Sequence, residues 1–292
     1  MSSPTPQRSR TASRLAAFTI VTVASLAIAS SATAHDFWLI PHMFGFSDGG
    51  TVHVDGQSGT RFATGTPVQP SRVAEVRVIG ATSEAKITEM AVEGSALRLS
   101  HKPTATGQYL IVAALTPPLR PARATPAGLI RFLKAEGGAA EATRLERDSL
   151  FMRADTVAYA SRSYAATIVQ VGNGGPRAFS KTPGYPLEFV PLTDPARLRV
   201  GDTLHVRILG NGKPVANIGV DATPAVDTSA AASAASGSQM MSIAADAQGV
   251  VHLPLSKAGP WMLRSAFVSP KPGTSNEFDV ARATYTFGVT AR

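Results

Sequence analysis

The 292-residue chain contains no cysteine, and this absence excludes several classes of structure and chemistry. Without thiols there is no disulfide framework, no thiolate zinc site, no cysteine nucleophile and no lipid-bearing cysteine of a bacterial lipoprotein. The fold must therefore be held together by packing alone. Any metal ion must be held by nitrogen and oxygen donors.

The chain also lacks the short motifs of common hydrolases and nucleotide-binding enzymes. It has no Gly-x-Ser-x-Gly elbow, no His-Glu-x-x-His helix and no phosphate-binding loop. The acidic pair Glu136 and Glu141 falls on a predicted helix, where we expect both side chains to be solvated. We therefore expect a protein that is not an enzyme.

Charged residues are scarce, at 16% of the chain, with a formal net charge of +8. Three arginines and no acidic residue lie in the first 34 positions, so the rest of the chain carries about +5 (8 minus 3). No block of Lys and Arg with interleaved aromatics follows, so we expect no nucleic-acid partner. No later apolar run is long enough to span a bilayer.

The first 34 residues have the pattern of a secretory signal peptide. A positively charged start leads into an apolar stretch at about 15–29 and then into the small-x-small sequence Ala32-Thr33-Ala34. We expect cleavage after Ala34, which leaves 258 residues in the periplasm or outside the cell. The alternative is a leader kept as an anchor, but its apolar stretch is short and diluted by threonine and serine.

Cleavage after Ala34 would make His35 the first residue of the mature protein. A terminal histidine carries a free α-amine and an imidazole Nδ1 that can close a chelate ring on one metal ion. Nitrogen donors in a tetragonal arrangement suit Cu(II) or Ni(II). Processing would then create a metal ligand as well as export the chain.

The remaining sequence predicts a mainly β fold. Short runs that alternate or carry β-branched residues are separated by Gly, Pro, Asp and Asn. We place a boundary near residue 194, between an N-terminal β-domain at 35–194 and a C-terminal β-domain at 195–292. The number and spacing of the runs favour two β-sandwiches of immunoglobulin or transthyretin type. The Ala-, Ser- and Gly-rich segment 229–239 predicts a flexible inserted loop.

One segment departs from the β pattern and predicts a helical insertion at about 125–150. Thr125 and Pro126 suit a helix N-cap followed by proline at the first helical position. Gly137 and Gly138 are expected to split the segment into two helices. We expect this segment to be an amphipathic cover packed on a sheet.

Several segments resemble a family of secreted bacterial proteins catalogued as domain of unknown function 4198. These segments are His35-Asp36-Phe37-Trp38-Leu39, Gly59-Thr60-Arg61-Phe62, Leu187-Glu188-Phe189-Val190-Pro191, Gly212-Lys213-Pro214 and Gly259-Pro260-Trp261. Members are often labelled the periplasmic component of nickel or cobalt transport. The resemblance covers nearly the whole mature chain, and it implies an exported two-domain β-protein with a membrane metal transporter as partner.

The chain departs from the family pattern at two places. Many relatives carry a histidine-methionine pair where this chain has Ala266-Phe267-Val268. A lysine is expected after Ser161-Arg162, where this chain has Ser163. If the missing histidine is a metal ligand in relatives, this chain needs a differently built site.

A terminal chelate needs further donors, and three residues are the candidates. His53 lies on the first long predicted strand, and Asp55 follows two residues later on the same face. His42 lies seven residues after His35 and is within reach if Pro41 turns the chain. For each histidine the alternative is an exposed or hydrogen-bonded residue without a metal role.

The other candidate ligands have simpler structural interpretations. Phe37 and Trp38 could wall a metal site, but we expect them to pin the mature N-terminus to the first sheet. Met240 and Met241 could bind Cu(I) through their thioethers, but we expect them to be packing residues. We expect structural roles for the three remaining histidines, His101, His205 and His252.

The sequence thus predicts a periplasmic protein that binds a divalent transition metal and passes it to a membrane partner. The metal is nickel or cobalt by resemblance and copper by ligand chemistry. The alternative is a metal-free interaction module for an envelope protein or polysaccharide. A third hypothesis is a copper-dependent oxygenase, by analogy with copper enzymes that have a terminal histidine.

Overall fold

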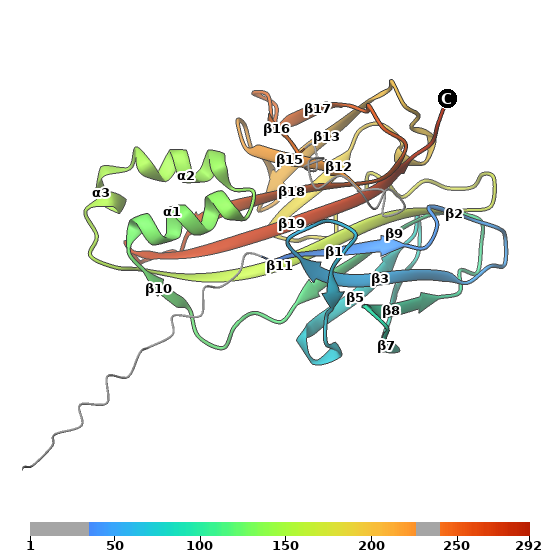
Figure 1. Cartoon of the computed structure of the whole chain (residues 1–292), viewed down its shortest axis with the longest axis horizontal. Helices are drawn as coiled ribbons and strands as arrows, with labels where there is room; N and C mark the ends of the chain where they lie inside the picture. Colours follow the sequence, from blue (N-terminus) through green and yellow to red (C-terminus); the bar gives the residue numbers. More distant parts are fainter. Residues whose placement is uncertain (1–34, 226–239) are drawn as a thin grey trace, which may run out of the picture. The chain divides into compact units, whose positions relative to one another are not determined.

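The computed structural model describes residues 35–225 and 240–292, and its strands form three sheets (Figure 1). The predicted signal peptide at 1–34 and the predicted loop at 229–239 lie outside the described residues. The five-stranded sheet A contains β1 (Asp36–Pro41), β3 (Val52–Gly59), β4 (Thr66–Pro67), β7 (Met90–Glu93) and β8 (Ala96–His101). The four-stranded sheet C contains β12 (Leu187–Pro191), β13 (Thr203–Gly210), β14 (Lys213–Pro214) and β17 (Val250–Pro254).

The largest sheet, sheet B, has ten strands drawn from both ends of the chain. Its main path runs β16-β15-β18-β19-β11-β9-β5-β6. The path strands are β5 (Val73–Ile79), β6 (Glu84–Lys86), β9 (Gly107–Leu115), β11 (Val157–Val171), β15 (Gly219–Pro224), β16 (Met241–Ala244), β18 (Gly259–Pro270) and β19 (Glu277–Val289), and both β2 (Gly45–Phe46) and β10 (Ala122–Ala124) pair with β11.

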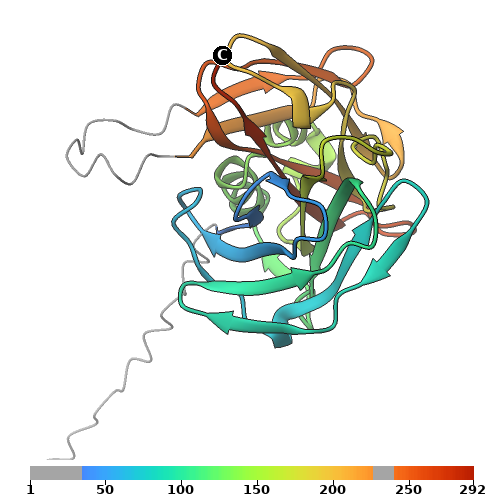
Figure 2. The ribbon, with the colours of Figure 1, turned by 90° about the vertical axis from the view of Figure 1, so that its right-hand side faces the viewer.

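Sheet B is buried on both faces, which explains its continuous apolar runs. In β9, Tyr109 and Ile111 face a core shared with sheet A, whereas Leu110 and Val112 face a core shared with sheet C. The period-2 alternation of a strand sends successive side chains to opposite faces. Figure 2 shows sheets A and C on opposite sides of the central strands. The fold class is therefore confirmed as mainly β, with two sandwich cores.

The two sandwiches differ from the expected pair of domains because they share sheet B. β11 precedes the predicted boundary near residue 194 and β19 follows it, yet the two strands pair in parallel from Ala158↔Glu277 to Thr167↔Thr286. The described residues form one compact unit. Two strands that lie more than a hundred residues apart in the sequence can pair in parallel without any local sequence signal. The sequence patterns therefore predicted two sandwich cores, but they could not predict that the cores share one sheet.

The helical segment forms as predicted and continues into a third short helix. The helices are α1 (Pro126–Ala135), α2 (Ala139–Glu146) and α3 (Ser149–Met152), and two 3-10 turns are η1 (Pro70–Arg72) and η2 (Pro195–Arg197). The Thr125 hydroxyl accepts the Gly128 N–H at 3.1 Å, which caps α1. Gly137, with φ of 77°, makes the turn to α2. The apolar side chains of α1 and α2, among them Leu129 and Leu133, pack on the C-terminal part of β18 and the N-terminal part of β19, as predicted for an amphipathic cover (Figure 1).

Two acidic residues of the helical segment differ from the prediction of solvated side chains. Glu136 is 2% exposed and binds Arg282 of β19, and Glu141 is 5% exposed and accepts hydrogen bonds from Arg144. The prediction was wrong for Glu136 because the turn after α1 faces Arg282 of β19, a partner that the helix pattern cannot locate. It was wrong for Glu141 because this side chain lies on the buried face of α2, where Arg144, three residues later on the same helix, pairs with it.

Candidate functional site

The first strand of the described chain is held against both sheet A and sheet B. β1 pairs with β3, and its backbone carbonyls at Phe37 and Leu39 accept the hydroxyls of Thr284 and Thr286 at 2.6 and 2.5 Å. Phe37 is 3% exposed and Trp38 is fully buried. The expectation that these aromatics pin the N-terminal strand is confirmed.

The register of β1 and β3 brings three of the four predicted metal ligands together. Pro41 pairs with Val54, and the next residue, His42, donates its backbone N–H to His53 at 3.0 Å, so the two histidines are cross-strand neighbours. Their ring centroids lie 5.8 Å apart. Asp55 lies on the same strand as His53, and its Oδ2 is 3.3 Å from His42 Nε2.

Each member of this cluster also has a neighbour that fixes its orientation. Asp55 Oδ1 accepts Arg98 Nε at 2.7 Å, so its charge is balanced within sheet A. His53 Nδ1 lies 3.0 Å from Ser100 Oγ. These contacts leave His42 Nδ1 and His53 Nε2 unused, and the two imidazoles are the donors that the cluster offers to a metal ion.

The structure does not bring His35 to this cluster. His35 precedes β1 and His42 follows it, so the two residues lie at opposite ends of a six-residue strand. At roughly 3.3 Å per residue, about 20 Å separates them. A single coordination shell containing His35, His42 and His53 is therefore wrong, because β1 is fully extended and Pro41 does not turn the chain back. Within residues 35–225 and 240–292, no three His, Asp or Glu side chains form a group that could hold a metal ion.

A buried charge cluster, which sequence analysis missed, lies beside the start of β1. Arg264 of β18 binds Asp36 at 2.8 Å and Asp221 at 3.1 Å. Arg282 of β19 binds Glu136. Burial raises the pKa values of both Asp36 and Glu136, and the arginines oppose that rise. The sequence signal for this cluster was the position of Arg264 and Arg282 within otherwise apolar strands. An arginine buried in such a strand needs an acidic partner, so these positions indicate a buried ion pair.

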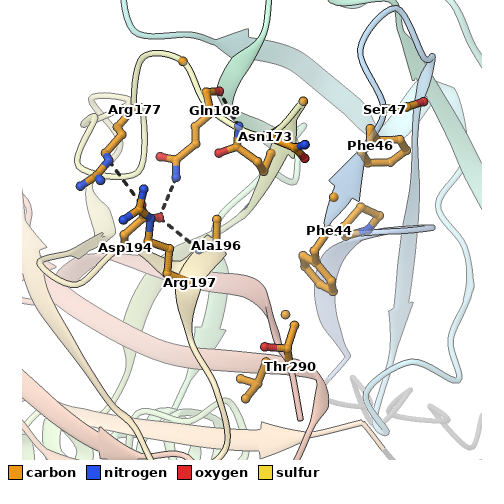
Figure 3. Close-up of a pocket in the computed structure, with 18 of the residues that line it drawn as sticks. Phe44, Phe46, Ser47, Gln108, Asn173, Arg177, Asp194, Ala196, Arg197 and Thr290 are labelled. Carbon is orange, nitrogen blue, oxygen red and sulfur yellow. Dashed lines mark hydrogen bonds and ion pairs between the residues drawn. The ribbon is translucent and has the colours of Figure 1, made fainter. Parts of the chain in front are cut away.

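A cleft with a volume of about 820 Å³ opens beside His42. Figure 3 shows Phe44 and Phe46 on one side of the cleft and Gln108, Arg177 and Asp194 on the other. Sequence analysis predicted none of these residues as a site. The residues of the cleft come from loops and strand ends that are distant in the sequence. The pairing register of the strands brings them together, and this register cannot be predicted from local sequence patterns.

Asp194 organises the polar wall of the cleft. Its Oδ1 accepts Gln108 Nε2 at 2.6 Å and the Ala196 N–H at 3.1 Å. The guanidinium groups of Arg177 and Arg197 lie 3.5 and 3.6 Å from Oδ2. Two cations on one carboxylate leave a net positive charge here. Both arginine side chains are more than half exposed, so they can turn toward a ligand.

Three other sequence candidates lie outside the cluster of His42, His53 and Asp55. His101 is partly buried, 6.0 Å between ring centroids from Tyr109, and burial lowers its pKa. Met240 is 49% exposed, so the expectation of a packing residue is wrong for it, and its Sδ lies 3.5 Å from Arg264. Met241 opens β16 and packs against the core between sheets B and C, as expected. Phe267 packs against the core between sheets B and C.

The described residues define a three-layer β-sandwich protein with a cross-strand histidine pair at the rim of an open cleft. Residues 32–268 match the family model described as Domain of unknown function (DUF4198). The chain belongs to this family. A comparison with curated proteins found no match.

Similar solved structures include trypsin-activated alpha-2-macroglobulin from Escherichia coli, at 11% identity, covering 88% of this chain and 16% of that chain with a TM-score of 0.21. They also include the Yersinia pseudotuberculosis adhesin InvE, at 15% identity, 87% and 59% coverage and a TM-score of 0.20. The Escherichia coli adhesin FdeC has 13% identity, 87% and 63% coverage and a TM-score of 0.23. The chain spans less than two thirds of each of these chains. Scores this low support no inference about fold or function.

None of the helices in the described part of the chain is long and apolar enough to cross a membrane.

Proposed function

We propose that the protein is a periplasmic, non-catalytic binding protein for a divalent transition metal, with His42 and His53 as the donors. The observation that carries this proposal is the cross-strand position of the two histidines, with ring centroids 5.8 Å apart at the rim of the cleft. A sheet holds neighbouring side chains in fixed relative positions, so the two imidazoles lose little freedom when they bind one ion.

Neutral imidazole is a good ligand for nickel, cobalt and copper ions. Asp55, itself held by Arg98, would orient His42 as a carboxylate partner of a metal-binding histidine. Two protein nitrogens leave the other coordination positions to water or to groups of a partner. Such an open shell suits a protein that captures an ion and hands it to a membrane transporter.

His35 would supply a separate chelate if the leader is removed after Ala34. The α-amine and imidazole of His35 would act at the other end of β1, independently of His42 and His53. Copper-oxygenase chemistry is not proposed, because His42 and His53 lie at the opposite end of β1 from His35 and cannot join it on one copper ion.

Calorimetric titration of Ni(II), Co(II) and Cu(II) into the protein beginning at His35 tests the metal proposal. We expect the double substitution His42→Gln/His53→Gln to lower the affinity of one site by more than about tenfold, because it removes both donors. The matched control is His101→Gln, which removes a histidine outside the cluster. His35→Gln separately tests the terminal chelate, because it removes the imidazole and keeps the terminal amine. Unchanged affinity in the double variant would contradict the assignment of His42 and His53.

A second candidate function, a metal-free binding module for envelope polysaccharide or protein, is favoured by the cleft. Its wall pairs the apolar Phe44 with the polar and cationic side chains around Asp194. Pockets of several hundred Å³ with a few convergent polar groups are typical ligand sites.

For this second candidate, we expect co-sedimentation with isolated envelope polysaccharide in the presence of EDTA. Binding should fall several-fold in Arg177→Ala/Phe44→Ala, which changes both walls of the cleft, and much less in His42→Gln/His53→Gln, which changes only its rim at His42. The exposed substitution Leu119→Ala serves as the control. No co-sedimentation with EDTA present would eliminate this candidate for polysaccharide.

A further inference from the structure

A second pair of histidines lies on the outer layer formed by sheet C. In the register of β13 and β17, His205 is directly opposite His252. Their Nδ1 atoms are 2.7 Å apart, and the ring centroids are 4.9 Å apart at an interplanar angle of 76°. The flanking residues Leu204 and Leu253 are fully buried, so the strand alternation fixes both histidines on the outward face.

A carboxylate fixes the proton of one of these rings. Asp246 Oδ2 lies 3.2 Å from His252 Nε2. Its Oδ1 accepts the N–H groups of Gln248 and Val250 at 2.8 and 2.9 Å, which holds the carboxylate in place. With the Asp246 carboxylate as acceptor, His252 Nε2 donates this hydrogen bond, and the lone pair of the ring is left on Nδ1. This is the arrangement in which a carboxylate orients a metal-binding histidine.

The backbone around His205 is equally constrained. Its N–H donates to Thr193 Oγ1 at 3.2 Å, and its carbonyl accepts the Leu192 N–H at 2.8 Å. A hollow of about 390 Å³ lies beside His205, with Asp202 on its lining. A bound ion would therefore have room for water or for an oxygen ligand on that side.

We propose that His205 and His252 form a binding site for Cu(II) or Ni(II), with their two Nδ1 atoms as a bidentate donor set. The site is independent of the proposed function, because it uses different residues on the opposite outer sheet. On metal binding, the proton that His205 shares through Nδ1 moves to its Nε2, so both rings coordinate as neutral imidazoles and no net proton is lost.

The two hydrogen-bonded nitrogens are close to the spacing of a right-angled donor pair. With metal–nitrogen bonds of about 2.0–2.1 Å, two donors at 90° are roughly 2.9 Å apart, and two donors at a tetrahedral angle are roughly 3.3 Å apart. From the hydrogen-bonded separation of 2.7 Å, the rings therefore move less to reach the right-angled arrangement than the tetrahedral one. Tetragonal nitrogen and oxygen coordination is the geometry of Cu(II) and Ni(II), whereas structural zinc is tetrahedral.

Copper titration followed by electron paramagnetic resonance tests the site in the protein with the first pair removed. The background is His35→Gln/His42→Gln/His53→Gln, so no imidazole of the other two nitrogen sets can contribute. We expect one equivalent of Cu(II) to bind with hyperfine splitting from two imidazole nitrogens. Either His205→Gln or His252→Gln should remove this signal, and His101→Gln should leave it unchanged.

The variant Asp246→Asn adds a graded measurement. It keeps both coordinating rings and removes the ionised acceptor, so we expect Cu(II) affinity to fall about tenfold without loss of the two-nitrogen signal. Absence of bound copper in the background protein, or copper binding that survives both histidine substitutions, would overturn the proposal. Because the background already lacks His42 and His53, failure here is distinct from failure of the proposed function.

Discussion

Replacing Arg264 with alanine is expected to lower the free energy of unfolding by about 3–5 kcal/mol, because it leaves buried carboxylates without their cation. Asp36 and Asp221 are each 11% exposed in their side chains, and Arg264 is 17% exposed. The arginine joins β18 to the start of β1 and to β15, so its loss affects three strands. Urea unfolding at neutral pH measures the effect.

An ion pair that is exposed on both sides separates the buried cation from ion pairing in general. Lys134 Nζ lies 2.7 Å from Glu146 Oε1, and the two side chains are 50% and 39% exposed. Exposed ion pairs contribute about 0–1 kcal/mol, so Lys134→Ala should cost no more than that. Equal losses in the two variants would contradict the assignment of Arg264 as the cation on which the cluster depends.

The pH dependence of the Arg264→Ala variant distinguishes lost charge pairing from lost packing. Burial raises the pKa of Asp36 above its ordinary 3.8, and Arg264 limits the rise. Without Arg264 the folded-state pKa rises further, so the folded variant binds more protons than the unfolded chain. Its stability is then greatest below the unfolded pKa and falls as pH increases through the folded pKa. The deficit relative to the parent protein should therefore be smaller at pH 4.5 than at pH 7.5, whereas a packing defect would not change.

Local sequence patterns predicted the features of this fold that depend on neighbouring residues. Thr125 and Pro126 located the start of α1, and alternation in 204–208 located β13 with its buried face. These signals work because helix capping and strand alternation involve residues within a few positions of one another. The pairing of β11 with β19 involves no such proximity, and so the shared central sheet was not predictable.

The same distinction applies to the candidate sites. His53 and Asp55 were placed on one face correctly, since they are two residues apart on one strand. The partner of His53 depends on the β1–β3 register, which gave His42 and not His35. The pairing of His205 with His252 could likewise not be predicted, because the two residues are 47 positions apart and become neighbours only through the register of β13 and β17. A cross-strand site requires register, and register is set by the whole core.

Replacing Trp38 with alanine is expected to cost about 3–5 kcal/mol of stability and to loosen β1. The indole is fully buried, contacts the Phe62 ring edge-on at 5.9 Å, and donates from Nε1 to Gln57 at 3.3 Å. Gly65 packs so closely that a Cβ there would lie 2.8 Å from the indole, so this neighbour has no side chain that could fill the space that alanine leaves. Denaturant unfolding gives the cost, and amide exchange of β1 reports its loosening.

The Trp38→Ala variant also links the strand to the proposed metal function, because β1 positions His42 against His53. We expect Ni(II) or Cu(II) affinity at that pair to fall with the protection of β1 amides, while copper binding at His205 and His252 on sheet C stays unchanged. Trp38→Phe keeps most of the buried area and loses the bond to Gln57, so it should cost only about 1–2 kcal/mol. Leu119→Ala, at a fully exposed position, should change stability by less than about 0.5 kcal/mol. Preserved affinity at His42 and His53 in a variant whose β1 amides exchange freely would show that the strand does not organise that site.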